Sequence, residues 1–519
     1  MRVKFMTAQE AAALIQDEAC IATSGFVGLG VPEELEMALG KRFEETGSPK
    51  NLTLYYAAGQ GDGKEKALNR LALEGLLKRV VGGHWNLAPK MQKLVLENKI
   101  EAYNFPQGVL SHVFRDAASG NKGTISKVGL KTFVDPEQEG GKLNEVTKED
   151  LVSRVQLEGE DYLYYKTPKL DFVLIRGTFA DELGNVSLQE EVASLDATNM
   201  ALACKSNGGT VIVQVKEIVN ANSLDPRYVK IPSSLVDVVV KTSDPALFHE
   251  QVYGEVFNPT YCGDAKMLLS GVTPPVLDNR KVIGRRGAME MKAYSTINLG
   301  IGIPELVGAV ANEEGQGDKI TLSVEAGLTG GVPLGGLKFG GAVNPQSILD
   351  QDVQFDFYDG GGLDATFLGL AQCDEKGNIN VSKFGPRIPG CGGFINISQN
   401  TKKVFFCGTF TAGGLKEEVK DGKLTILQEG REKKFIKKVE QITFSAEYAL
   451  ETGQEVTYIT ERCVLKLTAE GLMVTEIAPG VDLERDILAQ MDFTPVIARD
   501  LKEMDTRIFT DALMGLELQ

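Results

Sequence analysis

Short, uninterrupted runs of apolar residues recur along the chain and predict buried β-strands. They include residues 52–57, 172–177, 210–215, 320–325 and 403–408. These runs lack the strict alternation of apolar and polar residues that a sheet with one exposed face would show. Continuous apolar runs are typical of parallel strands covered on both faces, so we expect a parallel sheet between two covering layers.

Amphipathic segments with helical spacing lie between these runs. Residues 8–19 and 32–47 are two examples, and the second has Pro32 at its expected first helical position, followed by acidic residues. Proline is favourable there because its missing N–H would have no helical partner, and acidic side chains stabilise the positive end of the helix dipole. The alternation of strands and helices predicts an α/β fold.

Two motifs occur twice in the same order, which indicates two related domains. The glycine turn at 28–32 resembles the turn at 300–304, and a Leu-Asp pair followed by Asp-Glu-x-Gly-Asn occurs at 170–185 and at 363–378. The spacing between the motifs is longer in the first copy. We therefore expect an insertion in the first domain, roughly at 60–165.

A stretch rich in Pro, Asp and Asn separates the two copies. It covers residues 226–280 and favours turns over core elements. We therefore expect an N-terminal domain at 1–225, an ordered linker at 226–280 and a C-terminal domain at 281–519.

The composition argues against several classes of protein. The chain has 519 residues and a net charge of −16, which argues against nucleic acid or an anionic membrane as the main partner. Its three histidines lie far apart and its seven cysteines include no C-x-x-C pair, so we expect no metal site. The N-terminus has no apolar signal segment and no apolar run reaches the length of a membrane span, so we expect a cytoplasmic protein.

Glu325 stands at the end of one predicted strand and is followed by a glycine-rich loop. Ligands of open α/β sheets bind beyond the carboxyl ends of strands, so this carboxylate is well placed to react. Gly327, Gly330 and Gly331 would remove side-chain bulk around it. A carboxylate that only faces water would fit the same pattern.

Three other loops carry candidate backbone or amide contacts. At 300–304, a tight turn opens a predicted helix whose N–H groups would attract an anion, although the motif is neither G-x-G-x-x-G nor a P-loop. Gly392 and Gly393 could form an oxyanion hole or only a structural turn. Gln107, at a loop-to-helix transition, could bind a small carboxylate or serve only as a polar residue of the first turn.

Together these motifs resemble those of the family I coenzyme A transferases, which include the 3-oxoacid, acetate and propionate CoA-transferases. The resemblance covers nearly the whole chain and includes Gly-Phe-Val-Gly-Leu-Gly at 25–30, Pro-Gln-Gly at 106–108 and Glu-Gly-Gly at 139–141. Its best marker is the Glu-x-Gly-Leu loop at 325–328, which follows a Gly-x-Gly-x-Pro turn. The run at 358–416 looks closest to the bacterial propionate/acetate type.

The resemblance implies two related open α/β domains in one chain, a fold also known from NagB/RpiA-like proteins. It implies transfer of CoA between short-chain acyl-CoA and free carboxylates such as acetate, propionate or lactate. In the implied ping-pong cycle, Glu325 forms an acyl-glutamyl anhydride and then a glutamyl-CoA thioester. It implies no permanently bound cofactor and no metal, since CoA is a substrate, and it implies a homodimer or homotetramer.

The resemblance also assigns roles to the site residues. Glu325 would be the nucleophile, and the oxyanion would lie near Gly392 and Gly393. The residues for the acyl or carboxylate group would be Gln107, Gly25 and Phe26. The residues for CoA would be Gly300, Ile301, Gly302, Ile303, Pro304 and Gly390.

Two departures from the family pattern put the shape of the acyl pocket in doubt. The catalytic loop reads Glu-Ala-Gly where the oxoacid enzymes read Glu-Asn-Gly, and one glycine precedes Phe26 where many relatives have two. Three alternative functions stay open. They are acyl-CoA hydrolysis by the same residues, a succinyl-CoA-dependent 3-oxoacid transferase with an extra cationic group, and a non-catalytic ligand sensor.

Overall fold

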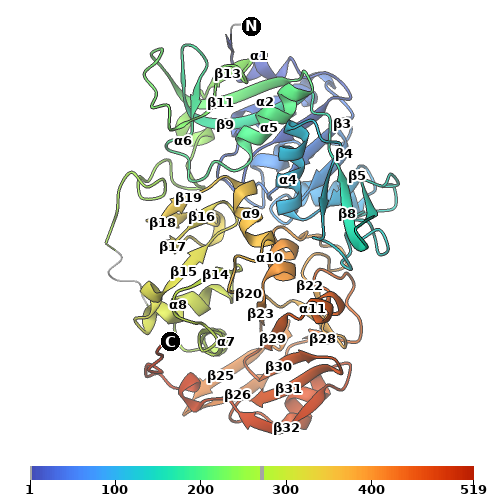
Figure 1. Ribbon diagram of the computed structural model, residues 1–519, viewed down its shortest axis with the longest axis vertical. Coiled ribbons are helices and arrows are strands. Elements are labelled where there is room, and N and C mark those ends of the chain that lie inside the picture. The colour runs from blue at the N-terminus through green and yellow to red at the C-terminus, as the bar shows by residue number, and fades with distance from the viewer. Residues whose placement is uncertain (1–2, 269–273) are drawn as a thin grey trace. The chain divides into compact units, whose positions relative to one another are not determined.

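The computed structural model describes residues 3–268 and 274–519, and the chain divides into two compact units (Figure 1). Unit 1 comprises Met1–Met267, Val324–Asp356 and Phe384–Asn396. Unit 2 comprises Leu268–Ser323, Phe357–Lys383 and Ile397–Gln519. Glu325 therefore belongs to unit 1, whereas the sequence assigns it to the C-terminal domain. The predicted domain boundaries are a different division of the chain and stay predictions.

Unit 1 is built around a sheet with the strand order β1-β13-β11-β9-β2-β3-β4-β5. Each neighbouring pair in this order is parallel. Strands β3, β9 and β11 form where the continuous apolar runs predicted them. The strands are β1 (Lys4–Phe5), β2 (Cys20–Thr23), β3 (Leu52–Tyr56), β4 (Leu77–Gly82), β5 (Glu101–Asn104), β9 (Phe172–Asp181), β11 (Thr210–Val219) and β13 (Val238–Lys241).

The helices of unit 1 pack on this sheet through apolar side chains. Leu35 and Leu39 of α2 share one buried cluster with Leu54 and Val80 of the sheet. The helices that lie within unit 1 are α1 (Ala8–Ala12), α2 (Glu33–Thr46), α3 (Pro89–Leu96), α4 (Gln107–Ala118), α5 (Ala197–Ser206) and α6 (Pro245–Phe248). Two further helices begin in unit 1, α9 (Gln351–Asp359) and α10 (Phe394–Asn400).

Two helix predictions need correction. The helix expected at 8–19 ends at Ala12, because Asp17 accepts hydrogen bonds from Ser48 Oγ and the Lys50 N–H and so holds a turn before β2. Pro32 precedes the helix as its N-cap residue, and α2 begins at Glu33.

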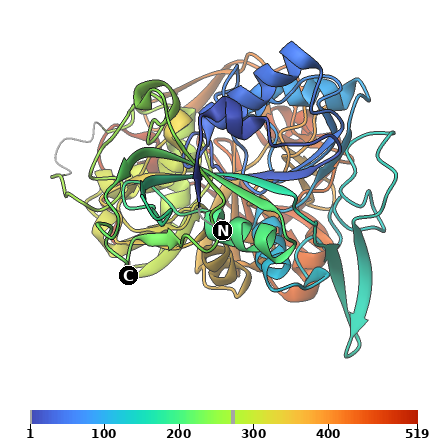
Figure 2. The ribbon, with the colours of Figure 1, turned by 90° about the horizontal axis from the view of Figure 1, so that it is seen from above.

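The range 226–280 is not a linker throughout. It contains β13, in which Val238, Val239 and Val240 are buried between β1 and β11, so this part is a core strand. The range 60–165 contributes β4 and β5 and then a small antiparallel sheet, and Figure 2 shows the paired strands β7 and β8 extending from unit 1. Its strands are β6 (Gly123–Ser126), β7 (Val152–Leu157) and β8 (Glu160–Lys166).

Unit 2 contains a sheet with the strand order β15-β14-β20-β23-β29-β30-β31-β32. The pairs from β15 to β29 are parallel, and β30 pairs antiparallel with both of its neighbours. The strands are β14 (Ser295–Leu299), β15 (Ile320–Ser323), β20 (Ala365–Gly369), β23 (Lys403–Cys407), β29 (Glu455–Ile459), β30 (Cys463–Thr468), β31 (Gly471–Ile477) and β32 (Val496–Glu503).

The core of unit 2 lies between this sheet and helices α7 (Asn279–Ala288) and α8 (Glu305–Glu313). Phe367 and Phe405 stack with their ring centroids 4.8 Å apart, and Val307 of α8 lies in the same buried cluster. The predicted α/β fold class is therefore confirmed. Within the described ranges, no helix combines the length and apolar character that a membrane crossing requires.

Short elements complete the two units. Those of unit 1 are β10 (Val186–Ser187), β12 (Val229–Ile231), β16 (Leu328–Thr329), β17 (Val332–Pro333), β18 (Ala342–Val343) and β19 (Ser347–Ile348). Those of unit 2 are β21 (Gln372–Asp374), β22 (Ile379–Asn380), β24 (Thr411–Ala412), β25 (Lys416–Lys420), β26 (Lys423–Gln428), β27 (Glu432–Lys433), β28 (Phe435–Ile436) and α11 (Ala446–Thr452).

Candidate active site

Glu325 lies in a tight turn two residues beyond the end of β15. The Val324 N–H donates to the Leu328 carbonyl oxygen at 2.8 Å, and the Gly327 N–H donates to the Val324 carbonyl oxygen at 3.0 Å. Only 9% of Glu325 is exposed. The turn therefore holds a mostly buried carboxylate in a defined place, which a reactive group needs.

The loop before α10 passes directly over the Glu325 side chain. A Cβ added to Gly393 would lie 3.1 Å from Glu325 Cγ and 3.3 Å from Phe355 Cζ. Such a contact is tighter than ordinary packing, so a side chain at 393 would displace the carboxylate or the ring. Glycine at this position leaves the room that Glu325 occupies.

Hydrogen bonds fix this loop to the carboxyl ends of β4 and β5. The Gly392 N–H donates to the Gly83 carbonyl oxygen at 2.7 Å, and the Cys391 N–H donates to Asn104 Oδ1 at 2.9 Å. The Gln107 N–H donates to the Gly392 carbonyl oxygen at 2.9 Å. Glu325 thus lies where ligands of parallel sheets bind.

The prediction that Gly392 and Gly393 form a pair of oxyanion donors needs correction. The Gly392 N–H is already used by the Gly83 carbonyl oxygen, so it is not available in this conformation. The Gly393 N–H has no acceptor among the described residues. An N–H group just before a helix has no helical partner, and the donor role of Gly393 stays a prediction.

Gln107 begins α4 and borders the same loop. It is 3% exposed, and a Cβ added to Gly392 would lie 3.8 Å from Gln107 Oε1. Phe355 packs between Gly108 and Gly393, since a Cβ added to either would lie within 3.4 Å of its ring. Unit 1 therefore brings together Glu325, the glycine loop and Gln107, although they are far apart in the sequence.

The other two residues predicted for the acyl group, Phe26 and Gly25, also belong to unit 1. Phe26 shares a buried apolar cluster with Val324 and Ala326, the two neighbours of Glu325. Gly25 precedes Phe26, and a Cβ added to it would lie 2.8 Å from Gln60 Cδ. The cluster makes the surroundings of the Glu325 turn apolar.

The predicted CoA residues divide between the two units. In unit 2, the Gly300 N–H donates to the Phe367 carbonyl oxygen at 2.8 Å, and 57% of Ile301 is exposed beside it. Pro304, like Pro32, is the N-cap residue, and α8 begins at Glu305. In unit 1, Gly390 packs against Trp85, 2.8 Å from where its Cβ would be, so packing alone explains glycine there.

Two residues near Gln107 were missed in the sequence. Asn104, fully buried at the end of β5, donates from Nδ2 to the carbonyl oxygens of Gly82 and Gly83 while its Oδ1 holds the loop. His84 lies 3.7 Å from where a Cβ of Gly392 would be, and burial lowers its pKa to about 4, so it is neutral. An Asn at the end of a strand is the only signal that the sequence offers for Asn104.

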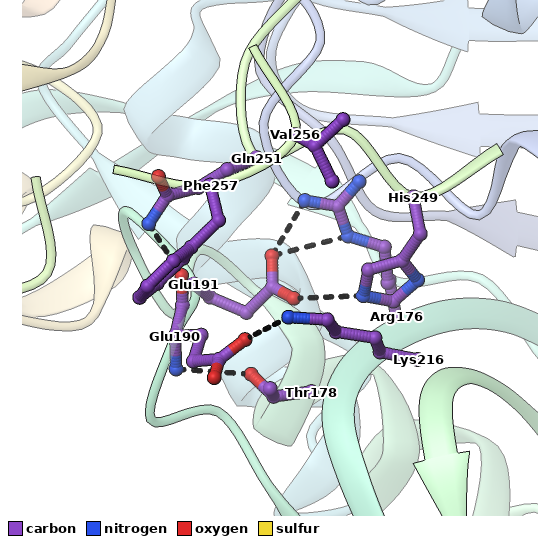
Figure 3. Close-up of a pocket in the computed structure, with 9 residues that line it drawn as sticks. All are labelled: Arg176, Thr178, Glu190, Glu191, Lys216, His249, Gln251, Val256 and Phe257. Carbon is purple, nitrogen blue, oxygen red and sulfur yellow. Dashed lines mark hydrogen bonds and ion pairs between the residues drawn. The ribbon is translucent and has the colours of Figure 1, made fainter. Parts of the chain in front are cut away.

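A separate pocket in unit 1 is lined by paired charges (Figure 3). Arg176 Nη2 lies 2.6 Å from Glu191 Oε2, and His249 Nε2 lies 3.4 Å from Glu191 Oε1. The Arg176 guanidinium also donates to the Val31 carbonyl oxygen at 3.3 Å. These charges balance one another and hold the glycine turn at 28–32. The lining residues are Arg176, Thr178, Glu190, Glu191, Lys216, His249, Gln251, Val256 and Phe257.

Comparison with known proteins points to one kind of chemistry. A family model described as Coenzyme A transferase matches residues 5–242. Acetate CoA-transferase YdiF of Escherichia coli strain K12 is 47% identical over 520 residues, which cover 100% of this chain and 97% of that protein. Caffeate CoA-transferase of Acetobacterium woodii is 46% identical over 519 residues, which cover 99% of each chain.

A solved structure shares the fold over the full length. The acyl-CoA transferase YdiF of Escherichia coli O157:H7, in a thioester complex with CoA, matches with a TM-score of 0.93 and 46% identity. The match covers 100% of this chain and 98% of that one.

Proposed function

The chain belongs to the coenzyme A transferase family, and from that premise we propose that it moves CoA between short-chain acyl-CoA and short-chain carboxylates through a thioester on Glu325. It is a CoA-transferase, as its relatives are. The covalent route, the acyl range and the roles of single residues are the proposal. The buried position of Glu325 beneath the Gly393 loop is the observation that carries it.

Each step in this route is an attack at a carbonyl carbon. A Glu325 carboxylate oxygen attacks the thioester, the C–S bond breaks, and an acyl-glutamyl anhydride and CoA thiolate result. The thiolate then attacks the glutamyl carbonyl and releases the first carboxylate, which leaves glutamyl-CoA. A second carboxylate reverses both steps. Carboxylate and thiolate act as nucleophiles in their ionised forms, so no proton transfer is required.

The negative charge that forms in each attack needs donors nearby. We assign this role to the Gly393 N–H, because Gly393 lies next to Glu325 and backbone donors held in position stabilise an oxyanion strongly. The turn at 300–304 would bind CoA, with exposed Ile301 as an apolar contact. The solved relative in a thioester complex with CoA supports a covalent intermediate of this kind.

The apolar surroundings of the Glu325 turn favour monocarboxylates. Phe26 and Phe339, 5.8 Å apart between ring centroids, lie in the cluster with the neighbours of Glu325. A second carboxylate, as in succinate, would lose hydration there without gaining a cation. Acetate and propionate are therefore the proposed acids. A homodimer or homotetramer and a cytoplasmic location stay predictions.

Intact-protein mass spectrometry after incubation with propionyl-CoA tests the proposal. We expect a CoA adduct that peptide mapping places on Glu325 and that acetate discharges. Glu325→Gln should form none and lose turnover by about three orders of magnitude or more, because a carboxamide is a poor nucleophile. The exposed Glu418→Gln should behave as wild type. An adduct on another residue, or acid-independent hydrolysis, would sink the proposed route.

A further inference from the structure

A chain of buried hydrogen bonds runs behind Gln107 in unit 1. Gln107 Nε2 donates to Gln351 Oε1 at 3.2 Å. Gln351 Nε2 then donates to Asp196 Oδ2 at 2.6 Å and to Ser111 Oγ at 2.9 Å. None of these side chains is more than 3% exposed. These hydrogen bonds thus connect the buried Asp196 carboxylate to Gln107, which borders the Gly392 loop.

The direction of this chain is set by its last member. An ionised carboxylate only accepts hydrogen bonds, so Asp196 draws the NH₂ group of Gln351 towards itself. The side-chain oxygen of Gln351 then faces Gln107, and Gln107 must donate a hydrogen bond to it from its own NH₂ group. The backbone of Gln351 is also held, because its N–H donates to the Leu195 carbonyl oxygen at 3.2 Å. As a result, Gln107 Oε1 faces the Gly392 loop.

We propose that Gln351 and Asp196 are positioning residues that set the orientation of the Gln107 carboxamide. They thereby decide whether the acyl site meets a carbonyl oxygen or N–H groups. This inference rests on the proposed function, in which Gln107 contacts the acyl or carboxylate group. Carboxylates and oxyanions accept hydrogen bonds, so the orientation with N–H groups towards the site is the one that binds them.

Protonation of Asp196 reverses the direction of the hydrogen bonds that link Asp196, Gln351 and Gln107. Its O–H group can donate to the Gln351 oxygen, Gln351 then turns its NH₂ group to Gln107, and Gln107 presents its own NH₂ group to the loop. Both amides turn, and no bond in the chain is lost. Protonated Asp196 is therefore the form that favours carboxylate binding.

The surroundings of Asp196 bring this proton within reach of neutral pH. Burial, together with the smaller effects of the Asp352 and Asp350 carboxylates, raises the pKa of Asp196 to about 7. The Ser111 hydroxyl and His112 act in the opposite direction. His112 belongs to α4 and lies 3.1 Å from Asp356 Oδ1, so it is a second titratable group that faces the same region.

Steady-state kinetics of paired variants test the inference, with propionyl-CoA as donor and acetate as acceptor from pH 6 to 8.5. Below pH 7, where Asp196 is protonated, Gln351→Met should lower kcat/KM for acetate about tenfold or more, because Gln107 loses the orientation with its NH₂ group towards the site. The matched control is Gln354→Met, on the same helix and equally buried, whose amide has no hydrogen-bond partner among the described residues. The control should keep wild-type kinetics, and thermal melting should show that both variants fold.

The pH profile separates positioning from a purely structural role. In the wild type, kcat/KM for acetate should rise as the pH falls through about 7, and Asp196→Asn should remove this inflection. An inflection that persists in Asp196→Asn would assign it to His112 and overturn the inference, as would equal kinetics of Gln351→Met and Gln354→Met. A wild-type protein without a CoA adduct on Glu325 would overturn the proposed function and this inference together.

Discussion

The two glycine turns at 28–32 and 300–304 are alike in sequence and opposite in their surroundings. Leu29 of the first turn is fully buried, whereas 57% of Ile301, its counterpart in the second, is exposed. Each turn leads into a helix, α2 or α8. The same local backbone pattern therefore serves two environments, one filled by the protein itself and one left open.

The first turn is filled by side chains from distant parts of unit 1. A Cβ added to Gly28 would lie 2.8 Å from the Tyr253 ring, and one added to Gly30 would lie 2.8 Å from Leu195 Cδ1. At Gly302 of the second turn, an added Cβ would meet no heavy atom within 4 Å among the described residues. The second copy therefore has open space at Gly302, a difference that the sequence alone does not show.

The second repeated motif behaves differently, because it is structural in both copies. Asp171 Oδ2 accepts from the Cys20 N–H at 2.8 Å, and Asp364 Oδ2 accepts from the Thr296 N–H at 2.8 Å. The later aspartates, Asp181 and Asp374, both bind the asparagine four residues on at 3.1 Å. This repeat therefore ties neighbouring strands together in each unit and carries no sign of a ligand.

The largest difference should appear when the two equivalent apolar residues are truncated. Leu29→Ala should lower the free energy of unfolding of unit 1 by about 2–5 kcal/mol, because it leaves a cavity in a packed cluster. Ile301→Ala should change stability by no more than about 0.5 kcal/mol and instead raise KM for acyl-CoA. Urea unfolding followed by tryptophan fluorescence measures the first effect, since the single tryptophan, Trp85, is buried in unit 1. Equal losses of stability would contradict the comparison.

The sequence predicted elements better than it predicted contacts. All five apolar runs became strands, and at β9 and β23 burial on both faces explains the local signature. The buried network had no such signature, since Gln107 and Gln351 are 244 residues apart and Gln351 and Asp196 are 155 apart. The role of Glu325 was suggested by family resemblance. Its contact with Gly393 needed the fold.

A smaller effect should separate the buried charges that hold the first turn. The Arg176 guanidinium lowers the pKa of Glu191 from 4.5 to about 2, against the effect of burial. A carboxyl group whose pKa is lower in the folded than in the unfolded protein stabilises the fold at pH values above its unfolded pKa. This contribution is lost as the pH falls, here between about 4.5 and 2. The shift corresponds to about 3 kcal/mol.

Trp85 fluorescence during urea unfolding at pH 5, 4 and 3 measures this contribution. The stability difference between wild type and the double variant Arg176→Met/Glu191→Met should shrink as the pH falls through this window. Burial lowers the pKa of His249 from 6.5, so the loss of its own contribution begins near that value, above this window. A difference that stays constant from pH 5 to pH 3 would mean that the pair does not support the turn.

The smallest and most specific effect should come from a single methyl group in the open turn. Gly302 has φ +91°, so alanine there should cost about 1–2 kcal/mol of stability in unit 2 through the backbone alone. If CoA occupies the turn, the methyl group should overlap with it and raise KM for acyl-CoA about tenfold. This corresponds to a loss of about 1.4 kcal/mol of binding free energy.

Gly315→Ala is the matched control for this last change. Gly315 follows α8 in the same unit, has φ +69° and also has open space at its Cβ position, so alanine there introduces similar strain away from the turn. It should lower stability as Gly302→Ala does and leave KM for acyl-CoA unchanged. If both variants raise KM for acyl-CoA equally, backbone strain explains the effect and overlap with CoA does not. That result would contradict the proposal that CoA binds at the turn at 300–304.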